Sequence, residues 1–168
     1  ANNTAVKYIK NFNKIIKICL ANHWLDRNPF ANYKSKVKEV ERVYLSEEEI
    51  QEIINKEFAT ERLSLVRDIF VFSCFTGLAY VDVRNLTKSH ISIGIDGDKW
   101  IFTHRQKTES ASKIPILPMT QMIIDKYDNH PQCLNEDKLL PILSNQKMNA
   151  YLKEIAAVCK IEKELTFH

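Results

Sequence analysis

The feature that most constrains the fold of this chain is one long apolar segment near its middle. Between Glu61 and Cys74 the chain is apolar on every side of a helix rather than along one stripe, through Leu63, Leu65, Val66, Ile69, Phe70, Val71 and Phe72. A helix that is apolar all round is a buried helix. We therefore expect a central core helix over about residues 61–74, broken by Gly77, and a globular domain packed around it.

Shorter amphipathic segments surround the central helix. Apolar residues at helical spacing predict helices over residues 3–22, 81–86, 119–128 and 145–159. Another helix is expected to begin after Ser46. Ser46 and Glu49 have the spacing of a capping box, in which each side chain accepts a hydrogen bond from the other residue's backbone amide.

Residues 91–117 have the alternation of strands instead. Ile91, Ile93 and Ile95 alternate with other residues, Asp96-Gly97-Asp98 has the composition of a turn, and a second strand resumes at Trp100. A polar turn and the sequence KIPILP then predict a third strand. The expected fold class is mainly α with a small three-stranded antiparallel sheet (α+β).

Positive charge is concentrated in the first quarter of the chain. The net charge is only +3, yet residues 1–42 carry nine lysines and arginines against three carboxylates, a net +6; the rest carries 15 against 18, a net −3. Lys7, Lys10, Lys14 and Lys17 recur every three or four residues and form one stripe of the first predicted helix. A polyanion partner and a merely solvated lysine face explain this stripe equally well.

A division into domains agrees with this charge distribution. The segment from Trp24 to Leu45 loses helical periodicity, contains Asn28-Pro29 and is basic, which is typical of a linker. We expect a terminal helix of one domain over residues 1–24, an interdomain linker over 25–43 and a second domain over 44–168. A chain that starts directly on such a helix is expected to be part of a longer protein.

Composition argues against several classes of protein. No long uncharged apolar run or signal-peptide pattern is present, which favours a cytoplasmic protein without a membrane partner. Only three glycines occur, so glycine-rich phosphate loops are not expected. The four cysteines are expected to be free thiols. Cys19 with His23, and His130 with Cys133, have workable zinc spacing but lie in different predicted domains, so we expect no metal and no cofactor.

Three short sequences in the second domain carry a resemblance to a known family. They are FTGLAYVDV at residues 75–83, RQKT at 105–108, and LSNQKMNAYLKEI with a later LTFH at 143–168. In this order and spacing they resemble the catalytic domain of the tyrosine recombinases, the phage-integrase family, and in particular integrases of conjugative transposons. The resemblance implies a catalytic domain over residues 44–168 that is incomplete at its C-terminus. Residues 1–42 resemble the last helix of the preceding core-binding domain and its linker.

The resemblance also implies a mechanism. Such enzymes cut and rejoin duplex DNA without a cofactor or metal. A tyrosine attacks the phosphodiester to give a 3′-phosphotyrosine, cations stabilise the phosphoryl oxygens, and a lysine protonates the departing 5′-oxygen. Lys107 matches the family's hairpin lysine, the general acid, and His168 matches the first residue of its His-x-x-Arg box. The expected phosphate contacts are Arg105, Lys113, Lys7, Lys10, Lys14, Lys17, Lys36 and Lys38.

Ala79 departs from the family pattern. The residue after TGL is usually the first active-site arginine, and an alanine cannot stabilise a phosphoryl oxygen. Arg84 lies five residues on, a rotation of about 500° on a helix, away from the direction of Ala79. Arg67 is the replacement that we slightly favour; no replacement at all, or an ion pair of Arg67 with a neighbouring carboxylate, are the alternatives. Asp82 is expected to brace the turn.

The nucleophile of the family would follow residue 168. None of the six tyrosines occupies its position, so we expect the 168-residue chain alone to be inactive and monomeric, and the full-length protein to form a tetramer on duplex DNA. The leading prediction is a site-specific recombinase or integrase of a mobile element. A non-catalytic DNA-binding relative with a regulatory role, which Ala79 favours, is the alternative. A helical protein-binding module is a third.

Overall fold

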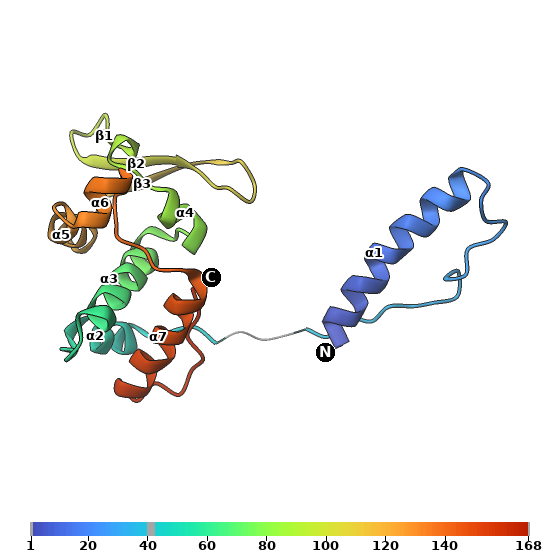
Figure 1. Ribbon diagram of the computed structural model, residues 1–168, viewed down its shortest axis with the longest axis horizontal. Helices are drawn as coiled ribbons and strands as arrows, with labels where there is room; N and C mark the ends of the chain where they lie inside the picture. Colours follow the sequence, from blue (N-terminus) through green and yellow to red (C-terminus); the bar gives the residue numbers. More distant parts are fainter. Residues whose placement is uncertain (1, 40–42, 168) are drawn as a thin grey trace. The chain divides into compact units, whose positions relative to one another are not determined.

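The chain forms two compact units, residues 1–43 and 44–168 (Figure 1). A computed structural model describes residues 2–39 and 43–167. His168, one of the predicted catalytic residues, lies outside the described residues. Each unit is described by itself below.

The first unit is one helix with a chain segment folded back along it. Helix α1, Asn2–Ala21, is present as predicted and buries Val6 and Ile16. After a turn, Phe30 packs edge-on against Phe12, with ring centroids 5.7 Å apart. Near the start of α1 the side chain of Asn3 bonds the backbone of Lys38. The segment that the sequence predicts to be an extended linker is therefore packed on α1 as far as residue 39.

The second unit is built around the predicted central helix. Helix α3, Glu61–Thr76, buries Val66, Ile69 and Phe72 completely and packs against α2, α5 and α7. Helix α2, Glu47–Asn55, begins at Ser46 with the predicted capping box. The amide of Ser46 donates to Glu49 Oε2 at 2.7 Å, and the amide of Glu49 donates to Ser46 Oγ at 3.3 Å.

A three-stranded antiparallel sheet lies at one end of this unit (Figure 1). Its strands are β1, Ile91–Ile93, β2, Lys99–His104, and β3, Ala111–Pro115. Ile101 on β2 pairs with Ile114 on β3 and is fully buried, so this face of the sheet packs on the core. The first strand is shorter than predicted, because the Gly94 amide bonds the Asp98 carbonyl and closes the turn before Ile95.

The remaining helices complete the core. Helix α4, Tyr80–Asn85, follows the Gly77 turn, and a 3-10 turn η1, Lys88–His90, leads into β1. Helices α5, Pro118–Tyr127, and α7, Asn145–Val158, are found where the sequence predicts them. The short helix α6, Pro131–Glu136, is not predicted; Pro131 supplies its first residue and His130 Nδ1 accepts from the Gln132 amide. Within the described residues, no helix has the length and apolarity needed to cross a membrane.

Candidate phosphate-binding site

The turn between α3 and α4 forms the floor of a small surface pocket. Gly77 ends α3 in the left-handed conformation, with φ 65°, and its amide bonds the Ser73 carbonyl at 2.8 Å. Leu78 is buried and anchors the turn in the core. Ala79 is the N-cap of α4, and its carbonyl accepts from the amides of Asp82 and Val83. Ala79 is also one of the residues that line the pocket.

Arg105 is the cation that the fold brings to this turn. It stands at the end of β2, and its guanidinium Nη2 donates to the Gly77 carbonyl at 3.2 Å. Arg105 lines the same pocket as Ala79, together with Ser73, Cys74 and Thr166. The sequence predicts Arg105 as a phosphate contact; its position next to Ala79 depends on the β2–β3 hairpin reaching α4, which no local pattern reveals.

Asp82 connects that hairpin to α4. Its buried carboxylate accepts from the Gln106 amide at 3.0 Å. The hairpin loop is closed from within by bonds from the Arg105 amide to the Ser110 carbonyl, 2.9 Å, and from the Glu109 amide to the Arg105 carbonyl, 2.7 Å. The bracing role expected of Asp82 is thus directed at the loop that carries Arg105 and Lys107.

Lys107 lies at the exposed tip of this loop, one residue beyond the bond to Asp82. Among the described residues its ammonium group has neither a hydrogen bond nor an ion pair within the protein. Lys113 lies on β3 opposite Phe102, on the face of the sheet away from Ile101, and does not line the Ala79 pocket. The loop therefore offers one tethered cation, Arg105, and one free cation, Lys107.

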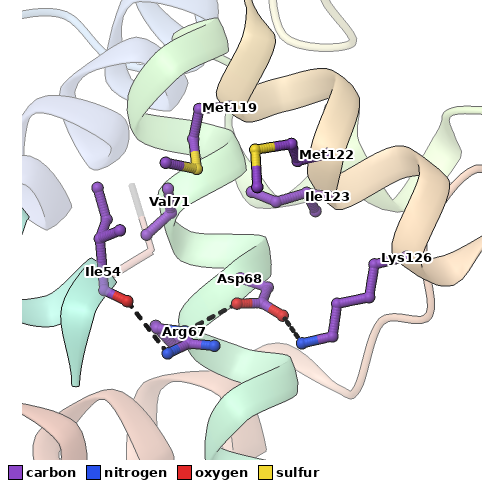
Figure 2. Close-up of a pocket in the computed structure, with 8 residues that line it drawn as sticks. All are labelled: Ile54, Arg67, Asp68, Val71, Met119, Met122, Ile123 and Lys126. Atoms are coloured by element: carbon purple, nitrogen blue, oxygen red, sulfur yellow. Dashed lines mark hydrogen bonds and ion pairs between the residues drawn. The ribbon is translucent and has the colours of Figure 1, made fainter. Parts of the chain in front are cut away.

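Arg67 does not lie at the Ala79 turn. It is on α3 itself, ten residues before Gly77, which places it about 15 Å away along the helix axis. Its guanidinium is held there by three bonds. Figure 2 shows two of them: Nε donates to Asp68 at 2.8 Å, and Nη1 donates to the Ile54 carbonyl at 3.2 Å. Nη1 also donates to the Lys56 carbonyl at 2.6 Å. The structure thus places Arg67 in the alternative role, an ion pair with its neighbouring carboxylate.

Asp68 is the centre of that separate cluster. Besides Arg67, its buried carboxylate accepts from Lys126 Nζ at 2.6 Å (Figure 2). It also accepts from the Tyr127 hydroxyl at 2.8 Å, and both bonds join α3 to α5. Burial, followed by the Asp68 charge, raises the pKa of Tyr127 far above its usual value. These contacts give the cluster a structural role in joining two helices.

The segment before His168 also reaches the Ala79 pocket. Phe167 is buried and packs edge-on against Phe70 and Tyr80, with centroids 5.9 and 6.0 Å apart. Its amide donates to Asn149 Oδ1 on α7 at 2.8 Å. Sequence reasoning misses this contact of Asn149, because no motif distinguishes Asn149 from the other polar residues of α7.

The pocket offers no strong nucleophile of its own in the described residues. Burial raises the pKa of the Cys74 thiol to about 11, so it remains protonated at neutral pH. Nor do the described residues contain a group of three or more His, Cys, Asp or Glu side chains able to hold a metal ion. The two possible zinc pairs lie in different units, and His130 instead caps α6.

A second basic surface lies on the first unit. Lys7, Lys10 and Lys14 line a groove together with Val6 and Val37. Lys36 and Lys38 flank Val37 on the segment that packs there, and Lys17 continues the helical stripe. The structure thus holds the backbone of two of the predicted linker lysines, Lys36 and Lys38, against the start of α1, the helix that carries the other predicted lysines.

Comparison with solved structures identifies the fold. Lambda integrase bound to DNA matches 92% of this chain and 56% of its own, with a TM-score of 0.67 and 16% identity. The chain has the tyrosine recombinase fold. A lambda integrase tetramer bound to a Holliday junction matches with a TM-score of 0.69 and 18% identity over 92% of this chain and 45% of its own. XerH site-specific recombinase bound to its difH substrate matches with a TM-score of 0.57 and 14% identity. The match covers 82% of this chain and 44% of the XerH chain.

The chain spans about half the length of the recombinase structures it matches. No protein-family model matches it, and no curated protein matches its sequence. The likeness to tyrosine recombinases confirms the predicted fold class, including the helical catalytic domain with its three-stranded sheet.

Proposed function

We propose that this chain is the DNA-binding and phosphate-activating part of a site-specific recombinase or integrase of a mobile element. The observation that supports this most strongly is the convergence at one pocket of the Ala79 turn, the hairpin that carries Arg105 and Lys107, and the Thr166–Phe167 segment. These three segments are also the ones that carry the sequence resemblance. The solved relatives of this fold include structures bound to DNA.

Arg105 takes the role of the cation that Ala79 does not provide. Cleavage of a phosphodiester places extra negative charge on the phosphoryl oxygens, and a preorganised donor stabilises that charge. The Gly77 carbonyl holds the Arg105 guanidinium at the turn, while the guanidinium keeps further N–H donors for a phosphate.

Lys107 is the general acid of the proposed reaction. A tyrosine hydroxyl gives its proton to solvent water and its oxygen bonds to phosphorus. The bond from phosphorus to the 5′-oxygen breaks, and Lys107 gives a proton to that oxygen. The product is a 3′-phosphotyrosine and a free 5′-hydroxyl, and the reverse reaction with another 5′-hydroxyl joins the strands. His168 would assist at the phosphate. The 168 residues hold no tyrosine in the nucleophile's place, so alone they bind DNA without cutting it.

The two units have different tasks in this proposal. Lysines of the first unit contact DNA phosphates, chiefly Lys7, Lys10, Lys14, Lys17, Lys36 and Lys38. Lys113 adds a contact from the outer face of the sheet. Assembly as a tetramer on duplex DNA, and a cytoplasmic location, follow from the same proposal. The complete reaction would need, besides these residues, the arginine, the second His or Trp and the tyrosine that the family resemblance implies.

A nicked suicide duplex tests the proposal in the longer protein. The expected result is a covalent protein–DNA adduct that contains phosphotyrosine. Lys107→Ala should slow its formation by about 10²- to 10⁴-fold with little loss of DNA affinity. A substrate with sulfur in place of the 5′-bridging oxygen has a leaving group that needs no proton, so it should restore the rate of Lys107→Ala.

Ala79 supports a second candidate function, a DNA-binding relative that has lost the chemistry. This candidate predicts the same salt-dependent DNA binding but no adduct from the longer protein. An adduct that forms at an unchanged rate in Lys107→Ala would instead refute the assignment of the general acid.

A further inference from the structure

The side chain of Asn3 makes two hydrogen bonds to the backbone of Lys38, the same pair of bonds that a residue of a neighbouring β-strand would make. Asn3 Nδ2 donates to the Lys38 carbonyl at 2.7 Å, and the Lys38 amide donates to Asn3 Oδ1 at 2.9 Å. A carboxamide can do this because it presents a donor and an acceptor side by side. Asn2 adds a bond from its Nδ2 to the Lys36 carbonyl at 3.0 Å. Residues 36 and 38 thus turn their backbone groups to the same side, which is the pattern of an extended chain.

This pairing determines where the side chains of the segment lie. Val37 lines the groove on α1 with Lys7, Lys10 and Lys14. Because side chains alternate along an extended chain, Lys36 and Lys38 leave the segment on the face opposite to Val37. We call these five lysines, Lys7, Lys10, Lys14, Lys36 and Lys38, the clamped lysine surface.

The clamped lysine surface has little negative charge near it in sequence. Over residues 2–39 the carboxylates are Asp26 and Glu39, against eight lysines and arginines. None of the ion pairs found among the described residues involves this part of the chain. Like charges repel by about 1 kcal/mol at 4 Å in water, and less when farther apart. Holding the segment against α1 therefore works against charge repulsion, which a bound polyanion would relieve.

We propose that Asn3 is a positioning residue that joins the two basic segments into one site for a nucleic-acid backbone. Asn3 carries no charge and contacts no phosphate in this role. It fixes the backbone of Lys36 and Lys38 along α1, so that the lysines of the two segments are held at a set spacing and can contact successive phosphates of one backbone. The inference rests on the proposed function, because it takes the DNA backbone as the polyanion.

The test measures DNA affinity of the 168-residue protein by fluorescence anisotropy at several salt concentrations. The probe is a duplex of arbitrary sequence. Each lysine–phosphate contact contributes about 0.9 to the slope of log affinity against log salt concentration. Asn3→Ala should lower that slope by up to about 1.8, the share of Lys36 and Lys38, and weaken binding on the order of tenfold. Asn11→Ala is the matched control, because Asn11 lines the same groove and makes no hydrogen bond to the segment among the described residues.

A double-mutant cycle separates positioning from a general loss of structure. In the background of Lys36→Ala with Lys38→Ala, Asn3→Ala should weaken binding no further, because the groups it positions are gone. The inference would be overturned if Asn3→Ala lowered DNA affinity equally in the wild type and in the double lysine variant. It would also be overturned if Asn3→Ala bound DNA as tightly as the wild type. Hydrogen exchange of the Lys38 amide tests the Asn3–Lys38 hydrogen bonds in the absence of DNA. This exchange should be slow in the wild type and fast in Asn3→Ala. If the wild type did not bind DNA, or bound it equally at all salt concentrations, the proposed function would be refuted. The proposal that Asn3 positions lysines for phosphate contact would then fail with it.

Discussion

Arg67→Ala should destabilise the second unit without touching the proposed chemistry. Arg67 is mostly buried, with a side chain 16% exposed, and it donates to one buried carboxylate and two backbone carbonyls. A hydrogen bond between charged groups contributes about 1.5–3 kcal/mol, and a bond to a neutral carbonyl about 0.5–1.5 kcal/mol. Asp68 keeps Lys126 and Tyr127 as partners, so the remaining carboxylate stays bonded.

We therefore expect Arg67→Ala to lower the free energy of unfolding by about 2–4 kcal/mol, after allowing for water at the freed carbonyls. Urea denaturation of the 168-residue protein, followed by far-ultraviolet circular dichroism, measures this change. Arg62→Ala is the matched control: its ion pair with Glu154 joins side chains 53% and 47% exposed, and such pairs contribute at most about 1 kcal/mol.

Two results would refute this reasoning. One is a loss of less than about 1 kcal/mol for Arg67→Ala, no larger than that of Arg62→Ala. The other is wild-type stability of the 168-residue Arg67→Ala protein together with loss of DNA cleavage when the same substitution is made in the longer protein, which would return Arg67 to the active site.

Three further predictions concern the pocket and the core. Gly77→Ala should destabilise the second unit by about 1–2 kcal/mol in urea denaturation, because φ is 65° at this residue although no atom stands in the way of a methyl group; an unchanged midpoint would contradict the strain argument. The raised pKa of Tyr127 makes the folded protein hold a proton that the unfolded chain loses above about pH 10, so stability should fall as the pH rises above 10, and more steeply than in Tyr127→Phe. If the free energy of unfolding fell equally with pH in the wild type and in Tyr127→Phe, the raised pKa of Tyr127 would be contradicted. Asn149→Ala should speed amide exchange at Phe167. Gln146→Ala, at an exposed residue of the same helix that makes no hydrogen bond to Asn149 among the described residues, should leave the Phe167 amide protected; equal exchange in both variants would contradict the role of the Asn149 contact.

The long-range contacts were the part that the sequence did not predict. The central helix and its end at Gly77 were predictable, because apolar residues on all sides require burial and a glycine tolerates a positive φ. The short helix α6 was missed because its six residues carry no full amphipathic repeat. The β1 strand was predicted too long because the alternation of isoleucines continues into a turn.

The absence of long-range contacts from sequence patterns also explains why Arg67, and not Arg105, was predicted to lie at the Ala79 turn. Arg67 is twelve residues from Ala79 and Arg105 is twenty-six residues away, so proximity in sequence favours Arg67. Helix α3 holds Arg67 ten residues before Gly77, whereas the antiparallel hairpin returns Arg105 to the turn. The bond from the Gln106 amide to Asp82 and the bond from Arg105 to Gly77 reveal this contact, and neither has a local sequence pattern.

The most direct test of the central claim is the single-turnover rate of adduct formation on a nicked suicide duplex, in the longer protein that contains these residues. Our account predicts that Arg105→Ala lowers this rate by about 10²- to 10³-fold, whereas Lys113→Ala changes it little. Adding Ala79→Arg to Arg105→Ala should recover at least part of the loss, because it returns a guanidinium to the same pocket. A rate for Arg105→Ala equal to that of the wild type, or no recovery with Ala79→Arg in a correctly folded protein, would contradict the assignment of Arg105.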